Sequence, residues 1–337
     1  MRSFRKLTLA TLIAVYLLIL VGGIVRSTGA GMGCPDWPKC FGQWVPPASV
    51  AELPANYKDI YAAHRHEKNQ RFAKYLSALG MKATAEKLLA DPTVLHENDF
   101  NPVKTRIEYI NRVVGVIIGF LIFSVFVSSV KFWRFERRLT VIAFLSFILV
   151  VFQGWIGSIV VSTNLTPWTI TVHMFLALLL VALLIYLYFV AGDEQPQRRP
   201  GSVGWLLACM AVLLVQIALG TQVREALDEV AAVAARENWI GEIGEPFIVH
   251  RSFSWIVFLL HVGLIYKLVK TDGPKAFSLI LILLILGTIL TGAGMALYAV
   301  PAFLQPVHLL LATVTFGMQF LLLLKLSSKE ESVLINT

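Results

Sequence analysis

The sequence predicts an all-α integral membrane protein with eight transmembrane helices, arranged as two parallel-duplicated four-helix bundles. Three observations predict this fold class. Of the 337 residues, 57% are hydrophobic and only 15% are charged, and the mean hydropathy is +0.71, a composition typical of membrane proteins. The apolar residues form runs of about 20, the length that spans a bilayer. Short motifs also occur in the same order in both halves of the chain.

Eight apolar runs predict the spans, near residues 7–25, 111–130, 140–162, 168–190, 203–222, 250–270, 276–298 and 302–325. The first run follows three basic residues and so resembles a signal peptide. Its uncharged part is longer than the apolar core of most signal peptides, so we expect a retained helix. Between the first two runs, the polar stretch 57–90 has apolar residues at helical spacing, which predicts short helices on the outer surface.

Basic residues mark one side of the predicted protein. They occur at the N-terminus, in the connections near 131–138, 198–199 and 267–275, and after the last helix at Lys325 and Lys329. Because basic loops face the cytoplasm, we expect a multi-pass protein of the cell inner membrane, surrounded by lipid bilayer, with both termini cytoplasmic. The net charge of +8 then belongs to the inner face and gives no reason to expect nucleic acid binding.

The two halves share a series of landmarks. The matching pairs are Gly-Gly-Ile-Val-Arg26 with Gly-Thr-Gln-Val-Arg224, Asn111-Arg112 with His250-Arg251, and His173 with His308. Each of the last two histidines follows a glycine-bearing helix and a short hairpin that contains proline. Four helices per repeat keep both copies in the same orientation. We therefore divide the chain into an N-terminal half, 1–192, with a long outer loop at 26–110, and a C-terminal half, 193–337.

Each half contains one histidine in a long stretch without charge, His173 and His308. A buried polar group in hydrocarbon is costly without a partner, so an intramembrane histidine favours a functional role. His250 is expected within about 10 Å of His308 in height, from a rise of about 1.5 Å per residue. Two imidazoles on facing helices are a known way to hold a haem iron, and Arg251 is then placed for a propionate. The alternative is that each histidine bonds only a neighbouring carbonyl.

The N-terminal half differs at one ligand position. Asn111 stands where the other half has its first histidine, and asparagine is a poor ligand for haem iron. This half therefore offers one strong ligand, His173, and leaves the opposite face of an iron open. Glu108 lies one turn before Asn111 on the same helix face and is a candidate to move protons. The alternative for Glu108 is an ion pair with Arg106 or Arg112.

Other reactive side chains have simpler interpretations. Cys34 and Cys40 lie in the first outer loop, in a compartment that favours a disulfide, either structural or redox-active. Cys209 is expected to be a packing residue. His261 is expected to be structural, because no second histidine lies at its depth. The remaining histidines are expected on the surface: His64, His66 and His96.

In these residues the chain resembles the haem A synthase family, over essentially all eight predicted helices. The motifs that carry the resemblance are Arg26-Ser-Thr-Gly-Ala-Gly, Cys34-Pro-Asp-Trp-Pro-Lys-Cys40, Glu108-Tyr-Ile-Asn-Arg112, Val172-His173, Gly220-Thr-Gln-Val-Arg224, His250-Arg251 and Val307-His308. The resemblance implies an oxidoreductase that converts the C8 methyl of haem O to a formyl group through hydroxylation. The product, haem A, serves terminal oxidases.

The resemblance also implies roles for individual residues. Haem b would be a cofactor held by His250 and His308, and haem O a substrate with His173 as ligand near Asn111 and Arg112. The glutamate that matches Glu108 is needed for activity in the family. The outer cysteine pair matches Cys34 and Cys40, whereas a second pair that some members carry is missing. A haem O synthase as donor, a membrane electron donor or acceptor and a homo-oligomer are further expectations.

Other functions explain part of the pattern. A cytochrome b-type electron carrier would have paired histidines in both halves, and Asn111 counts against it. A quinone-linked thiol oxidoreductase would need a second reactive cysteine pair on the outer side. A transporter would need charged residues along its pathway. A haem O synthase is disfavoured because the helices lack aspartate clusters for Mg²⁺ and a diphosphate.

Overall fold

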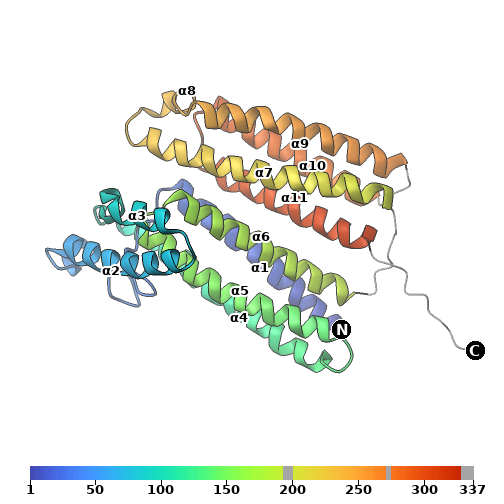
Figure 1. Cartoon of the computed structure of the whole chain (residues 1–337), viewed down its shortest axis with the longest axis horizontal. Coiled ribbons are helices and arrows are strands. Elements are labelled where there is room, and N and C mark those ends of the chain that lie inside the picture. Colours follow the sequence, from blue (N-terminus) through green and yellow to red (C-terminus); the bar gives the residue numbers. More distant parts are fainter. Residues whose placement is uncertain (193–199, 271–274, 328–337) are drawn as a thin grey trace, which may run out of the picture.

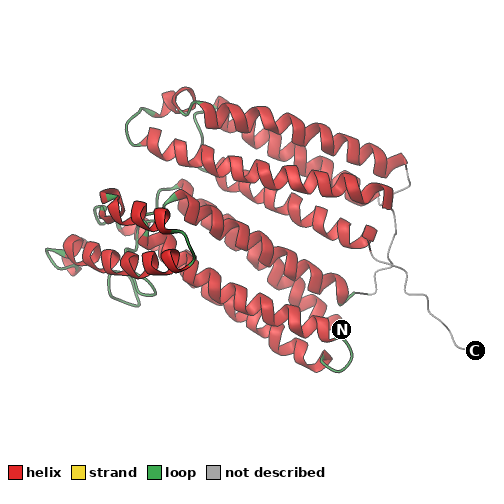
Figure 2. Cartoon of the chain, viewed as in Figure 1, coloured by secondary structure: helices red, strands yellow, loops and turns green. Residues whose placement is uncertain are grey.

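Helices are the regular secondary structure of the described part of this chain. A computed structural model describes residues 1–192, 200–270 and 275–327, and within these ranges every regular element is a helix (Figure 2). Eight helices are long and apolar enough to cross a membrane: α1 (Arg2–Ser27), α4 (Pro102–Ser129), α5 (Arg137–Ser162), α6 (Pro167–Val190), α7 (Pro200–Ala231), α9 (Glu245–Lys270), α10 (Lys275–Leu297) and α11 (Leu304–Ser327). The predicted class, an all-α multi-pass membrane protein, is confirmed.

The long helices lie in two groups (Figure 1). Within one group, α1, α4, α5 and α6 contact one another in a ring, and α7, α9, α10 and α11 form a second ring. Helix α11 also contacts α1 and α6, and α6 contacts α7, so the two groups pack side by side. The parallel duplication of the two halves stays a prediction. Its boundary after residue 192 adjoins 193–199, which lie outside the described residues.

The two hairpins that precede the intramembrane histidines have the same unusual backbone. Asn164 and Leu165 join α5 to α6 with φ values of 50° and 61°, and Ala299 and Val300 join α10 to α11 with values of 50° and 53°. In both turns the second residue donates its N–H to a carbonyl of the preceding helix at 2.9 Å. Positive φ is uncommon outside glycine, especially for a β-branched residue. Because the two turns are alike, the helix that carries each histidine leaves its hairpin in the same way in both halves.

Several helices begin earlier than the apolar runs predict, among them α4 and α9. Helix α4 starts at Pro102, where the Asn101 side chain accepts hydrogen bonds from two backbone N–H groups of the first turn, at 3.0 and 3.1 Å. Helix α9 likewise starts before its apolar part. Asn111 and His250, where two of the predicted spans begin, therefore lie inside helices, and the predicted starting points are wrong. Capped polar turns extend a helix beyond the membrane, whereas the prediction was based on apolar length alone.

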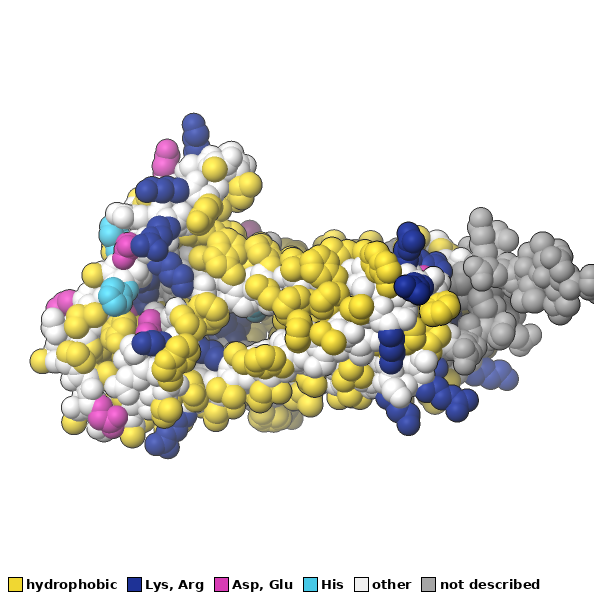
Figure 3. All heavy atoms as spheres, turned by 90° about the horizontal axis from the view of Figure 1, so that it is seen from below, with side chains coloured by type: hydrophobic (Ala, Val, Ile, Leu, Met, Phe, Trp, Pro, Cys, Tyr) yellow, Lys and Arg dark blue, Asp and Glu magenta, His cyan; other side chains and the backbone are white. Residues whose placement is uncertain are grey.

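Apolar side chains cover the middle of the molecule, and charged side chains gather toward its two ends (Figure 3). Large hydrophobic residues in the spans are widely exposed, among them Phe120, Trp255 and Leu290 at 67%, 63% and 70%. Such a belt is suited to lipid. The cytoplasmic placement of the termini stays a prediction, and Arg198, Arg199 and Lys329, which support it, lie outside the described residues.

The long outer loop folds into the predicted short helices and lies at one end of the N-terminal bundle (Figure 1). Its elements are η1 (Val50–Glu52), α2 (Tyr57–Ala78), α3 (Lys82–Ala90) and η2 (Pro92–Leu95). Asn69 on α2 donates to the carbonyl of Ser162 at the end of α5, at 2.7 Å. A buried ion pair, Arg65 with Glu97 at 2.6 Å, joins α2 to the segment after η2. The C-terminal half has only η4 (Arg236–Asn238) and the short α8 (Trp239–Glu242) in the corresponding connection.

Candidate functional site

The two predicted haem ligands of the C-terminal half face each other. His250 on α9 and His308 on α11 have ring centroids 6.4 Å apart, with the ring planes at 64°. Metal–imidazole bonds are about 2 Å long, so this spacing allows one metal ion to bond both rings. The pairing also agrees with the predicted equal depth of the two residues.

A threonine orients the His308 ring. Thr291 on α10 lies 2.9 Å from His308 Nδ1, and its hydroxyl has carbonyl acceptors at Gly287 (2.8 Å) and Thr288 (3.0 Å). A hydroxyl carries one proton. When that proton goes to a helix carbonyl, the oxygen accepts from His308 Nδ1–H, and Nε2 keeps a free lone pair. Metal-binding histidines are commonly oriented in this way through the second nitrogen.

Glycine and glutamine support the histidines of the C-terminal pair. Gln216 on α7 donates to the backbone carbonyl of His250 at 3.0 Å. A Cβ atom at Gly220 would lie 3.3 Å from the His250 ring, and one at Gly292 would lie 3.2 Å from the His308 ring. Each ring is thus packed against a helix backbone at a position where any side chain would be tight. These small residues are required by the ring positions.

The N-terminal half repeats part of this arrangement. Gln153 on α5 donates to the backbone carbonyl of His173 at 3.0 Å, and a Cβ atom at Gly157 would lie 3.6 Å from the His173 ring. Gly22 on α1 corresponds in sequence to Gly220, yet a Cβ atom there would meet nothing within 4 Å. The missing neighbour is the ring that Asn111 does not supply.

Polar contacts join the two halves near these sites. Thr171 on α6 donates to Thr221 on α7 at 3.0 Å, and each threonine is close in sequence to a site residue of its own half. At the ends of α1 and α7, Asp228 pairs with both Arg26 and Arg224. The motif arginines predicted from the sequence therefore meet across the interface between the bundles.

Glu108 lies in a buried polar cluster with the disulfide loop. Its carboxylate accepts from the backbone N–H of Cys34 at 2.8 Å and pairs with Arg112. Arg112 also donates to loop carbonyls, including those of Cys34 at 2.8 Å and Lys39 at 2.9 Å. Of the two arginines considered for Glu108, the partner is Arg112. Both side chains thus hold the loop against α4, and the Arg112 guanidinium is occupied by Glu108 and the loop carbonyls.

The predicted disulfide is present between Cys34 and Cys40, with 4.9 Å between the Cα atoms. The two residues are 0% and 1% exposed. Thr105 of α4 donates to the carbonyl of Gly33 at 2.8 Å, and a Cβ atom at Gly33 would lie 2.5 Å from the carbonyl oxygen of Lys104. The loop is therefore packed directly on the α4 backbone, which buries the bridge away from thiol reagents.

The remaining sequence-predicted residues lie apart from these sites. Arg251 is exposed on α9, next to His250.

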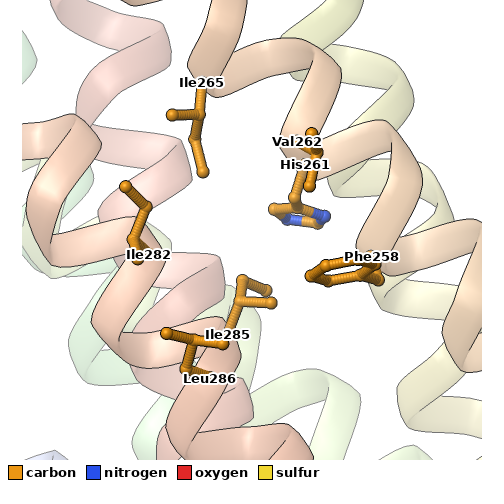
Figure 4. Close-up of a pocket in the computed structure, with 7 residues that line it drawn as sticks. All are labelled: Phe258, His261, Val262, Ile265, Ile282, Ile285 and Leu286. Carbon is orange, nitrogen blue, oxygen red and sulfur yellow. The ribbon is translucent and has the colours of Figure 1, made fainter.

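His261 is buried between Val257, whose carbonyl lies 2.6 Å from Nδ1, and Gln319, whose Nε2 lies 2.6 Å from the His261 Nε2. It faces an apolar cavity of about 90 Å³ between α9 and α10 (Figure 4). Both ring nitrogens are engaged, in agreement with a structural role. Cys209 is buried, and the loop histidines His64, His66 and His96 are exposed, as predicted.

Unpaired buried atoms test whether a haem fits. Those at the two sites are His250 Nδ1 and Gln216 Oε1 in one half, and His173 Nδ1, Asn111 Oδ1 and Gln153 Oε1 in the other. Buried polar atoms are normally paired, so each half has polar capacity left for a ligand. Over the described ranges, no group of three or more His, Cys, Asp or Glu is placed to hold a bare metal ion. A haem needs only axial ligands from protein, and the residues present fit that requirement.

Sequence reasoning missed the residues that support the histidines. Gln153, Gln216 and Thr291 are polar residues within long apolar runs, and that contrast is a usable signal. Their partners come from other helices, so only the fold identifies them.

Comparison with known proteins identifies the family of the chain. A relative named "Heme A synthase" from Shewanella oneidensis is 25% identical over 308 residues, which covers 81% of each chain. Others with that name, from Halalkalibacterium halodurans and Rickettsia akari, are 22% and 24% identical and cover at least 90% of both chains. Residues 5–320 match the cytochrome oxidase assembly protein family COX15-CtaA, and the chain belongs to this family.

Proposed function

We propose that this protein is a haem A synthase, an oxidoreductase that converts the C8 methyl of haem O to a formyl group through a hydroxylated intermediate. The observation that carries the proposal is the facing pair His250 and His308, 6.4 Å apart, beside a second site with a single histidine. One site is thus equipped to retain a haem and the other to exchange one. Family membership and the names of the relatives support the same activity.

The resident cofactor in this proposal is haem b, held by His250 and His308, with Arg251 at the water boundary. When bound, haem b supplies one-electron transfer. Thr291 fixes the His308 ring and Gln216 fixes the α9 backbone at His250. These contacts hold both rings before the cofactor binds, which reduces the entropy lost on binding.

The substrate site in this proposal lies between α4 and α6. His173 binds the iron of haem O from one side, and Asn111 leaves the other side accessible to water or oxygen. Arg112 holds the disulfide loop over the site through three backbone carbonyls. Glu108 holds Arg112 and also offers a carboxylate for protons released when the methyl group is oxidised.

Several features of the cellular setting are part of the proposal. The protein lies in the cell inner membrane with both termini cytoplasmic, because the basic connections gather at one end. A haem O synthase supplies the substrate, and a membrane component exchanges electrons with the cofactor. The Cys34–Cys40 bridge is structural, since both sulfurs are buried.

The test is haem extraction and chromatography after expression of this chain with a haem O synthase in a host that lacks haem A. Haem A or its hydroxylated precursor is expected, and a host with the haem O synthase alone is the control. Unchanged haem O beside a purified protein that carries only bis-histidine haem b would contradict the proposal. That result would favour a cytochrome b-type electron carrier.

A further inference from the structure

A cavity of about 240 Å³ lies between the disulfide loop, α2 and the outer end of α5. We call it the mouth cavity. The residues that matter for its chemistry are Asp36 and Lys39 from the loop, His64, Arg65 and Lys68 from α2, and Ser162 from α5. The C-terminal half has no helix that corresponds to α2, so this cavity belongs to the N-terminal half alone.

Lys68 reaches from the mouth cavity toward the proposed substrate site. Its ammonium donates to the carbonyl of Ser158 on α5 at 3.1 Å. Ser158 directly follows Gly157, the residue whose backbone lies against the His173 ring. The cation is therefore bonded to the α5 backbone at the residue after the one that contacts the histidine ring.

The Lys68 ammonium is placed to bind an anion. Across the described ranges, no carboxylate lies within salt-bridge distance of it, and the carbonyl of Ser158 is its hydrogen-bond acceptor. The acid that lines the cavity, Asp36, accepts instead from the backbone N–H groups of Phe41 (2.6 Å) and Gly42 (2.9 Å). Burial and the nearby Arg112 lower the pKa of Lys68 to about 8, so a bound anion would stabilise the charged form.

The other cations around the cavity are less suited to this role. Arg65 is buried and already pairs with Glu97 at 2.6 Å. Lys39 is exposed, and its ammonium lies 5.7 Å from the centre of the Trp44 ring. Lys68 is the cation that is both partly buried and aimed at the bundle.

We propose that the mouth cavity binds a carboxylate of the porphyrin substrate and that Lys68 is its cationic partner. The inference rests on the proposed function. A haem carries its propionates on one edge, and with the iron at His173 the charge of that edge favours the polar end of the bundle over the hydrocarbon. Lys68 then distinguishes the substrate site from the cofactor site, where the described residues include no counterpart of α2.

The experiment is a binding titration with haem O and with its dimethyl ester, which has no free carboxylate. The full-length protein, purified with its cofactor in detergent, is titrated as wild type, as Lys68→Met and as Lys74→Met, an exposed lysine on the same helix. Wild type and Lys74→Met are expected to bind haem O roughly tenfold more tightly than the ester, the ratio for one charge-assisted hydrogen bond. Lys68→Met is expected to bind both equally.

Two outcomes overturn the proposal. If Lys68→Met weakens haem O and the ester by the same factor, the lysine only caps α5. If wild type shows no preference for the free acid, the cavity does not bind the carboxylate. This outcome is independent of whether the variant folds. Lys68→Arg retains the charge and is expected to keep the preference. A His173→Ala protein assigns the titrated site, and absence of any haem O binding in wild type would instead contradict the proposed function.

Discussion

The two halves of the molecule share a scaffold but differ in what they offer an iron. Each has a proline-containing hairpin with the same positive-φ turn, followed by a histidine packed on a glycine. The C-terminal half completes the site with His250, whereas the N-terminal half has Asn111 and a cover made of the disulfide loop and α2. Two strong ligands suit a retained cofactor. One ligand beneath a polar cover suits a molecule that must enter, react and leave.

The largest expected effects come from the histidines themselves. His308→Ala is expected to lose the b-type haem and to reduce haem A formation by more than about a hundredfold, since one axial ligand is gone. His173→Ala is expected to keep the b-type haem and still lose haem A formation. Haem content, measured by absorption spectroscopy, and haem A formation, measured by chromatography, distinguish the two variants. The exposed His66→Ala is the control, and retention of bis-histidine haem in His308→Ala would refute the assignment.

The next test makes the N-terminal half resemble the C-terminal half. Asn111→His is expected to convert substrate-loaded enzyme to a six-coordinate, low-spin iron, because a second imidazole then faces His173. Asn111→Ala is expected to leave the spectrum as in wild type. A wild-type spectrum that already shows bis-histidine iron in this half would mean that another residue supplies the second ligand.

In the N-terminal half, a buried ion pair of α4, Glu108 with Arg112, holds the disulfide loop. Glu108→Gln and Arg112→Met each leave a buried group without its charged partner, which typically costs about 3–5 kcal/mol. Both are expected to lower the thermal denaturation midpoint in detergent. If Glu108 only clamps the loop, the two variants lose haem A formation to a similar extent. A much larger loss in Glu108→Gln than in Arg112→Met would indicate a direct role in proton transfer.

The sequence predicted the spans, the intramembrane histidines and the outer disulfide because each leaves a local signal. Apolar length identifies a span, and a histidine is conspicuous in an uncharged run. It named Arg112 among the partners of Glu108, but it could not predict that both side chains bind the Cys34 loop, since those contacts join segments far apart in the chain. Lys68 is missed for the same reason. In the sequence it is one of many loop lysines, and only the packing of α2 on α5 places it at the mouth cavity.

A smaller effect is expected from matched glycines of α1 and α7. Gly220→Ala places a methyl group 3.3 Å from the His250 ring, which must shift, whereas Gly22→Ala meets nothing within 4 Å. Gly22→Ala is expected to be neutral or to stabilise by up to about 1 kcal/mol, from helix propensity. Gly220→Ala is expected to weaken retention of the b-type haem. Equal haem content and equal melting midpoints in the two variants would show that the halves are packed alike here.

The smallest effect is a pH dependence at the cover of the N-terminal half. Burial lowers the pKa of Lys68 from 10.5 to about 8, with Arg112 acting in the same direction and Asp36 opposing it. Below the lowered pKa, lysine is charged in both folded and unfolded protein, so the folded state bears the full cost of burying the charge. As pH rises from about 8 toward 10.5, the folded state loses that charge first, and stability relative to Lys68→Met is expected to rise.

The C-terminal half supplies the control for this pH dependence. Arg236 is exposed and donates to the carbonyls of Ala299 and Val300 in the second hairpin, both at 2.9 Å. Because arginine side chains stay charged in proteins, the stability difference between wild type and Arg236→Met is expected to stay constant over the same range. The measurement is the denaturation midpoint of the three proteins at pH 7 and pH 9.5. Parallel shifts of wild type and Lys68→Met would show that Lys68 keeps its proton, and that the N-terminal cover is more open to water than the structure indicates.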